Sequence, residues 1–260
     1  MSGQERRLGG PAGADRATRR TGDAVPIPGA YQHDALTRGP RVQRYWHRAK
    51  LELLDWYFEV RPGDRVLDVG AGSGVFADRI ARLGGDVTAV DGNPDAVEYA
   101  RRTFARPGLA FELGLVDELE FPPRSFDRAT CLEVVEHIHP GQIGVMLRAV
   151  HRFLKPGGTL LVTTPNYRGL WPAVEWVVDR LGVAARMDAE QHVTHLDRAR
   201  LSEHLREAGF RVAAIRTYCT FAPFVAALSW SAARGVDRLE RSVDLPFGNL
   251  LAAIAVKPAS

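Results

Sequence analysis

The chain has 260 residues, of which 45% are hydrophobic and 25% charged, and a formal net charge of +3. This length suits one large domain with a substantial core, and this composition excludes disorder of the whole chain. We expect residues 1–28 to be a disordered, solvated leader, with attraction to nucleic acid or to an anionic membrane as the alternative. Because the leader has no apolar run, it is not a secretory signal. Its positive charges are Arg6, Arg7, Arg16, Arg19 and Arg20.

Cysteine content and apolar runs point to a protein of the reducing cytoplasm. The two cysteines, Cys131 and Cys219, are too few for a disulfide framework and lack the spacing of metal-binding pairs. No apolar run reaches the roughly 18 to 20 residues needed to cross a bilayer. The closest run, residues 221–233, predicts a buried helix, and a helix lying on a membrane surface is the alternative.

The first predicted element is a helix over residues 41–60. Apolar residues recur there at steps of three and four, which places one apolar stripe along a helix. The stripe consists of Val42, Trp46, Ala49, Leu53, Trp56 and Val60. The sequence Arg-Pro-Gly-Asp at residues 61–64 ends the helix.

Short apolar runs then alternate with helical patterns. This alternation requires crossover connections and therefore a mostly parallel sheet covered by helices on both faces. The predicted strands are 65–69, 86–90, 109–113, 126–131 and 159–164, and the predicted helices are 76–83, 94–103 and 141–153.

The C-terminal third interrupts the alternation twice. Residues 166–196 precede a helix at 197–208 and a strand at 210–217, and residues 219–249 precede a last strand at 250–256. The sequence therefore predicts one α/β domain over residues 29–260, with a seven-stranded sheet and two lid-like helical insertions.

A glycine-rich loop follows the first strand, in the sequence VLDVGAGSG at residues 66–74. Gly70, Gly72 and Gly74 allow a tight turn and a close approach of the backbone to a ligand, and the next helix offers unpaired N–H groups. A dinucleotide fingerprint would need glycine where this chain has Val75. Asp68, inside the strand, suits a ligand with an amino group and a sulfonium, namely S-adenosylmethionine. A tight structural turn is the alternative.

Asp91 ends the second strand, 21 residues after Gly70. A carboxylate at this position can accept hydrogen bonds from both hydroxyls of a ribose. Asn93 and Pro94 already fill the cap and first-turn positions of the next helix, so Asp91 is not needed as a cap. We therefore expect Asp91 to bind a ligand.

Four ordered segments carry a family resemblance. VLDVGAGSG, VDGNPDAVEYA, SFDRATCLEVVEHI and LKPGGTLLVTTPN resemble the successive motifs of class I S-adenosylmethionine-dependent methyltransferases. The branch they resemble contains the ubiquinone-biosynthesis O-methyltransferases. The resemblance covers residues 65–166 and continues more weakly to about Phe210. It implies a Rossmann-like sheet and S-adenosylmethionine as cofactor.

The resemblance also implies roles for single residues. Asp68, Gly70 and Gly72 would flank the methionine part of the cofactor, and Asp91 would hold the ribose. Leu115 stands where the family usually has an acidic residue, so adenine recognition would rest on backbone groups or on Asp117. The full expected cofactor site is Asp68, Gly70, Ala71, Gly72, Gly74, Asp91, Gly92, Val116, Asp117, Cys131 and Leu132.

An E-x-x-E-H segment follows the fourth strand, as Glu133, Glu136 and His137. On a helix these steps would bring all three side chains onto one face, as half of a site for Mg²⁺ or Mn²⁺. The segment binds metal in the ubiquinone O-methyltransferases and in the small-RNA 3′-end 2′-O-methyltransferases. The RNA enzymes add a histidine, for which His192 or His195 is available. Relatives without a known metal exist, and carboxylates at a helix start also interact with its dipole. In the absence of metal, we expect His137 to act as the general base on an acceptor hydroxyl.

The two insertions predict the nature of the acceptor. They bring aromatic and apolar residues to the ligand-binding edge of the sheet, either as a lid over an apolar acceptor or as plain core. These residues are Tyr167, Trp171, Trp176, Met187, Phe221, Phe224 and Trp230. We expect O-methylation of a small prenylated, lipid-like or polyketide-like compound, without a nucleic-acid partner but with membrane contact open. The alternatives are an RNA 3′-end 2′-O-methyltransferase, a nicotinamide-dependent oxidoreductase and a non-catalytic binding module.

Overall fold

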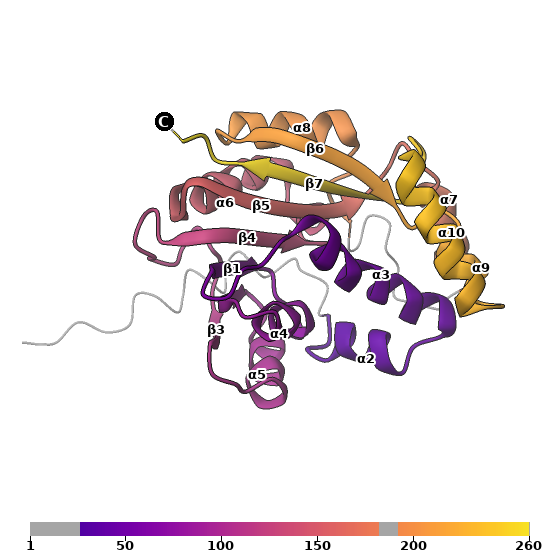
Figure 1. Ribbon diagram of the computed structural model, residues 1–260, viewed down its shortest axis with the longest axis horizontal. Helices are drawn as coiled ribbons and strands as arrows, with labels where there is room; N and C mark the ends of the chain where they lie inside the picture. Colours follow the sequence, from indigo (N-terminus) through magenta and orange to yellow (C-terminus); the bar gives the residue numbers. More distant parts are fainter. Residues whose placement is uncertain (1–26, 182–191, 260) are drawn as a thin grey trace, which may run out of the picture.

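A computed structural model describes residues 27–181 and 192–259 (Figure 1). Most of the expected leader, residues 1–26, lies outside the described residues, as do Met187 and part of the first insertion. The described parts contain the predicted alternation of strands and helices. None of their helices combines the length and the apolar character that a membrane span requires.

A single sheet of seven strands forms the centre of the fold, in the order β3-β2-β1-β4-β5-β7-β6. Neighbouring strands from β3 to β5 pair in parallel, whereas β7 runs antiparallel to both β5 and β6. This confirms the predicted seven-stranded, mostly parallel sheet. The strands are β1 (Arg65–Val69), β2 (Asp86–Asp91), β3 (Leu109–Leu113), β4 (Phe126–Leu132), β5 (Leu154–Pro165), β6 (Arg211–Tyr218) and β7 (Leu250–Val256).

Helices cover both faces of the sheet because successive strand residues point to opposite sides. Val66 packs into a core cluster with α3 (Arg41–Tyr57), α4 (Val75–Arg82) and α5 (Pro94–Thr103). Its neighbour Leu67 packs into a second cluster with α6 (Pro140–Phe153) and α8 (Arg198–Glu207). Strands that are buried on both faces account for the continuous apolar runs in the sequence.

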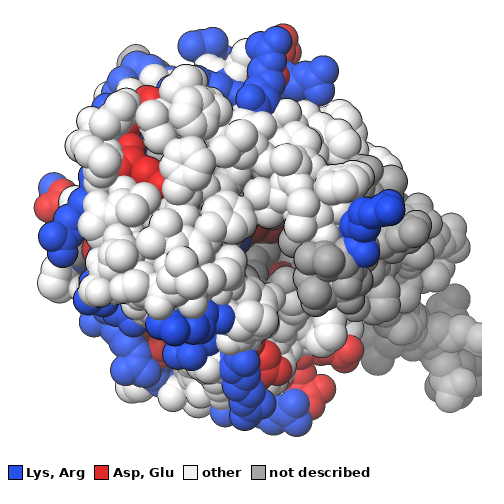
Figure 2. Space-filling view, turned by 90° about the vertical axis from the view of Figure 1, so that its right-hand side faces the viewer, with Lys and Arg blue, Asp and Glu red and all other residues white. Residues whose placement is uncertain are grey.

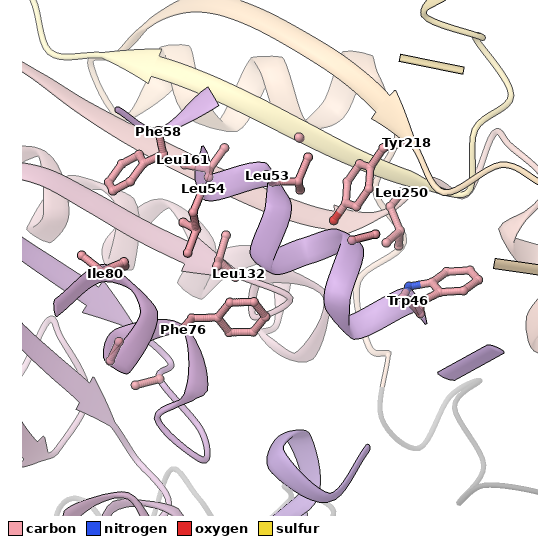
Figure 3. Close-up of a cluster of buried hydrophobic side chains, with 14 of the residues drawn as sticks. Trp46, Leu53, Leu54, Phe58, Phe76, Ile80, Leu132, Leu161, Tyr218 and Leu250 are labelled. Atoms are coloured by element: carbon pink, nitrogen blue, oxygen red, sulfur yellow. The ribbon is translucent and has the colours of Figure 1, made fainter. Parts of the chain in front are cut away.

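The helix predicted at 41–60 is α3, and it ends three residues early, at Tyr57. Figure 3 shows α3 crossing one face of the sheet. Leu53 and Leu54 of α3, and Phe58 directly after it, are fully or almost fully buried and point toward the strands. Helix α3 therefore places its remaining inward residues at one edge of the sheet.

Within the described residues, three further helices come from the insertions and one precedes α3. The insertions supply α7 (Trp171–Leu181), α9 (Ala222–Val225) and α10 (Trp230–Val243), and α2 (Tyr31–Thr37) precedes α3. The sequence predicts one buried helix for the apolar run at 221–233, and this prediction is wrong. The run is divided between α9 and the start of α10, with Ala222 buried and Leu228 86% exposed. The run therefore has one buried side and one exposed side.

Candidate functional site

A cavity of about 930 Å³ opens at the carboxyl ends of the parallel strands, where open α/β sheets bind ligands. The glycine loop and Asp91 line one part of it, and residues from α3, α7 and the E-x-x-E-H segment line the other. Figure 2 shows a hollow on this side of the molecule, with acidic atoms at its bottom and uncharged residues along much of its rim. One cavity thus contains residues of both the predicted cofactor site and the predicted metal and acceptor site.

The glycine loop requires glycine for two different reasons. Gly70 has a φ of +71°, and a Cβ there would lie 2.4 Å from Val134 Cγ2, so only glycine lets the loop pass this close to the end of β4. Gly74 has a φ of +83°, and its Cβ would meet the ring of Phe111 at 2.8 Å. Gly70 therefore shapes the cavity wall, whereas Gly74 packs the loop against the core.

Asp91 lies beside the glycine loop, as the ribose assignment requires. Its Oδ2 accepts a hydrogen bond of 2.7 Å from Gly72 N, and its Oδ1 accepts one of 2.8 Å from Asn93 N. Burial raises the pKa of Asp91, and the two N–H donors oppose that shift. The carboxylate is thus oriented by the two loops between which it stands, with lone pairs left for a ligand.

Asp68 is buried behind the loop, with Oδ1 accepting a 2.6 Å hydrogen bond from the Thr130 hydroxyl. Its Oδ2 is buried without a hydrogen-bond partner. Burial raises the pKa of Asp68 to about 6, the Thr130 hydrogen bond lowers it, and the Asp91 charge adds to the increase. Thr130 thus holds one oxygen of Asp68 behind the loop, and the other oxygen has no donor among the described residues.

The predicted cofactor residues fall into two groups. Gly70, Gly72, Asp91, Gly92, Val116 and Asp117 line the cavity. Asp68, Ala71, Gly74, Cys131 and Leu132 are buried behind its walls. For both groups, contact with a cofactor stays a prediction.

A buried ion pair that the sequence analysis missed lines the same cavity. Lys50 Nζ, from α3, donates to Glu133 Oε2 at 2.9 Å, and Lys50 is only 7% exposed. Glu133 Oε1 is buried without a hydrogen-bond partner. The sequence predicts a helix that carries Glu133, but the structure shows none there. The φ of Glu133 is +56°, and only Val135–His137 form a 3₁₀ turn. Glu133 therefore pairs with α3 and does not share one helical face with Glu136 and His137.

Glu136, His137 and His192 come together in the other part of the cavity. Each offers one possible metal-ligating atom, and these atoms lie within 4.8 Å of one another. Glu136 is 1% exposed and accepts a 3.1 Å hydrogen bond from Thr164 Oγ1. Burial raises the pKa of Glu136, and the nearby Glu133 charge raises it further. The group thus contains three of the four predicted metal ligands and excludes Glu133, which is paired with Lys50.

Of the two candidate histidines, His192 is the one that lines the cavity. His195 instead stacks on Tyr167, with ring centroids 4.0 Å apart, and lines a separate cavity. Among the predicted acceptor-side aromatics, Trp171 and Phe224 line the main cavity, whereas Tyr167 and Trp176 line the other one. Phe221 is 47% exposed, and Trp230 packs edge-on against Tyr45.

Comparison with curated proteins gives relatives for the central part of the chain. A 108-residue stretch is 42% identical to the ubiquinone biosynthesis O-methyltransferase of Xanthomonas campestris pv. campestris (strain B100). A 120-residue stretch is 41% identical to the protein of the same name from Xanthomonas euvesicatoria pv. vesicatoria (strain 85-10). The first match covers 40% of this chain and 44% of the relative, so the chain spans less than half the length of that protein.

Solved structures share the fold over most of the chain. An Archaeoglobus fulgidus SAM-dependent methyltransferase has a TM-score of 0.62 at 20% identity, covering 87% of this chain and 99% of its own. A [4+2]-cyclase, SpnF, has a TM-score of 0.58 at 24% identity, covering 83% of both chains. Both likenesses show the fold alone. The family profile described as a methyltransferase domain matches residues 39–215. Since this match spans more than half of the sequence, the chain belongs to the methyltransferase-domain family and has the Rossmann-like fold of S-adenosylmethionine-dependent methyltransferases.

Proposed function

We propose that the protein is an S-adenosylmethionine-dependent methyltransferase that methylates a hydroxyl oxygen of a small apolar acceptor. The observation that carries this proposal is that the glycine loop and Asp91 line the same cavity as His137 and His192. A methyl donor and a proton acceptor are the two requirements of O-methylation. A cavity of about 930 Å³ also lies within the size range of small-molecule sites.

The Lys50–Glu133 pair suits the amino-acid end of the cofactor, which carries an ammonium and a carboxylate. Glu133 Oε1 has no hydrogen-bond partner and would accept from the ammonium, while the Lys50 ammonium has further donors for the carboxylate. Both residues line the cavity beside Gly70. Asp91 would hold the ribose, and Val116 and Asp117 would lie beside the adenine.

The remaining task of the protein is to align the acceptor and to receive its proton. S-adenosylmethionine supplies a methyl group on a sulfonium, which is already a strong electrophile, so the residues around it need only orientation and exclusion of water. The proton of the hydroxyl would pass to an imidazole. The sequence predicts His137 for this role, and His192 is a second candidate. The ring centroids of the two histidines lie 5.1 Å apart.

The acceptor side of the cavity is mainly apolar. Its walls include Trp46, Ile138, Met146, Trp171, Val174 and Phe224. Such a lining excludes water and binds an apolar body through burial of its surface. The Xanthomonas relatives are named as O-methyltransferases of ubiquinone biosynthesis, which supports a hydroxyl acceptor of this kind. The two cysteines are free and buried, in keeping with a proposed cytoplasmic location.

A divalent cation at this site is the alternative to proton transfer onto an imidazole. One carboxylate and two imidazoles suit Mn²⁺ better than Mg²⁺, which prefers oxygen ligands throughout. A bound cation would lower the pKa of an acceptor hydroxyl and orient it. Glu136, His137 and His192 would hold the cation, and Glu133 would stay paired with Lys50.

The RNA alternative would need a basic surface with stacking aromatics around the site. The described residues around the hollow in Figure 2 are mostly uncharged, which favours the small-molecule acceptor. The oxidoreductase alternative is disfavoured by Val75 and by the match to the methyltransferase profile. A binding module without catalysis would bind the cofactor but transfer no methyl group.

Two measurements test the proposed function. S-adenosylhomocysteine at one hundred times its dissociation constant should stabilise the protein by about 2.7 kcal/mol, and NAD should leave its melting temperature unchanged. Methyl transfer from radiolabelled S-adenosylmethionine would then be measured on phenols and catechols with and without prenyl tails, and on RNA 3′ ends. Label in a prenylated phenol supports the proposal. Stabilisation by NAD, label only in RNA, or no transfer to any hydroxyl compound would reject it.

A further inference from the structure

A buried carboxylate from α7 holds one histidine of the cavity. Glu175 Oε1 lies 2.7 Å from His192 Nδ1, and the two residues are only 4% and 6% exposed. The Tyr167 hydroxyl donates to the same Glu175 oxygen at 3.0 Å and lies 2.9 Å from Nδ1. Two side chains, those of Glu175 and Tyr167, thus meet at one nitrogen of the imidazole.

This contact determines which ring nitrogen faces the cavity. An ionised carboxylate can only accept a hydrogen bond, so Nδ1 must carry the proton that it donates to Glu175. In a neutral imidazole Nε2 is then the nitrogen with a free lone pair. Because His192 lines the cavity and Nδ1 is engaged by Glu175, Nε2 is the atom available to a ligand there.

The backbone around His192 is fixed in the same place. The N–H groups of Val193 and Thr194 donate to the Glu136 carbonyl at 2.9 and 3.0 Å. The Thr194 hydroxyl donates to the Ile138 carbonyl at 2.5 Å. The chain at 192–194 is therefore joined to the turn that carries Glu136, and the Glu175 contact sets the remaining freedom of the ring.

We propose that Glu175 is a positioning residue, and that it makes His192 the imidazole that receives the proton of the acceptor hydroxyl. This inference rests on the proposed O-methylation. The acceptor oxygen forms a bond to the methyl carbon as the carbon–sulfur bond breaks, its electron pair passes to sulfur, and the hydroxyl proton passes to Nε2. The positive charge that develops on the ring is stabilised by the Glu175 carboxylate at Nδ1. A base held by a buried carboxylate is a recurring arrangement in catalysis.

The test compares Glu175→Ala with the conservative variant Glu175→Gln, whose amide oxygen can still accept from Nδ1. Glu203→Ala, at an exposed carboxylate on α8, is the control. The tautomer of His192 is read from the ¹⁵N resonances of its side chain, assigned with His192→Asn, in protein held in excess EDTA. Calorimetry with S-adenosylhomocysteine and the kcat and KM for a phenolic acceptor complete the set.

Wild type should show the Nδ1–H tautomer. Glu175→Ala should lose it and lower kcat about 100-fold, with unchanged affinity for S-adenosylhomocysteine. Glu175→Gln should restore the tautomer and part of kcat. An unchanged tautomer in Glu175→Ala, a kcat within about twofold of wild type, or turnover of wild type that ceases in EDTA would overturn the proposal. If wild type transfers no methyl group even with added Mn²⁺, the proposed function fails, while the tautomer data still decide whether Glu175 orients His192.

Discussion

Asp91 Oδ2 accepts a 2.7 Å hydrogen bond from the backbone N–H of Gly72, so the carboxylate proposed to hold the ribose also orders the loop proposed to hold the methionine. Asp91→Asn exchanges one acceptor oxygen for an amide N–H₂ that cannot accept from Gly72 or Asn93. Because hydrogen bonds to a charged group are each worth about 1.5 to 3 kcal/mol, we expect roughly 100-fold weaker binding of S-adenosylhomocysteine by calorimetry. Glu98→Gln, at an exposed carboxylate on α5, should bind normally. Normal binding by Asp91→Asn would remove the ribose assignment.

Lys50 should matter for both stability and cofactor affinity. Lys50→Met leaves Glu133 buried without its cation, which for buried ion pairs costs about 3 to 5 kcal/mol of unfolding free energy. The double variant Lys50→Met/Glu133→Gln removes the unpaired charge and should recover most of that stability in urea titrations. Its affinity for S-adenosylhomocysteine should remain low, because the Lys50 ammonium and the Glu133 carboxylate, the two proposed partners of the ligand's amino-acid end, are both gone. Normal affinity in the double variant would show that the pair is purely structural.

The strands and most helices could be predicted from the sequence because their signals are local. β5 is the exception among the strands: it begins at Leu154, five residues before the prediction, because its Pro-Gly-Gly segment has the composition of a turn. The contacts of the site could not be predicted. Lys50 and Glu133 are 83 residues apart, and periodicity predicts the helix that carries Lys50 but not the strand end that it meets. The left-handed backbone of Glu133 likewise depends on its surroundings, since E-x-x-E-H alone is compatible with a helix.

Asp68 should make stability depend on pH in an unusual direction. Its pKa is about 6 in the folded protein and near 3.9 in an unfolded chain, so the folded state binds the proton more tightly. Its contribution to the unfolding free energy is therefore full below about pH 4 and is lost as the pH rises through about 6. Asp68→Asn removes this dependence. Its melting temperature relative to wild type should rise between pH 4 and 6 and then stay level, and a difference that is constant from pH 4 to 7.5 would contradict the assignment.

Chelation separates the metal proposal from base catalysis without metal. If a cation held by Glu136, His137 and His192 is required, excess EDTA should abolish methyl transfer and Mn²⁺ should restore it. His137→Ala should then weaken the binding of Mn²⁺ in calorimetry, whereas Glu133→Gln should leave it unchanged because Glu133 is paired with Lys50. Full turnover in EDTA would exclude a metal requirement. Loss of Mn²⁺ binding in Glu133→Gln would instead place Glu133 among the ligands.

Gly70→Ala tests whether the loop needs glycine for its backbone conformation or for space. A left-handed residue other than glycine costs about 1 to 2 kcal/mol, and overpacking costs about 1 to 3 kcal/mol more. Gly63 has a φ of +85° with nothing within 4 Å of its Cβ position, so Gly63→Ala measures the first cost alone. At Gly70 the new Cβ also meets Val134, and the loss of unfolding free energy should therefore be larger. The double variant Gly70→Ala/Val134→Ala frees that space at a partly buried position. It should recover the unfolding free energy that Gly70→Ala loses beyond the loss in Gly63→Ala, apart from the packing that Val134 itself supplies. The single variant Val134→Ala measures that packing. Equal losses in Gly63→Ala and Gly70→Ala would mean that the loop can move away from Val134.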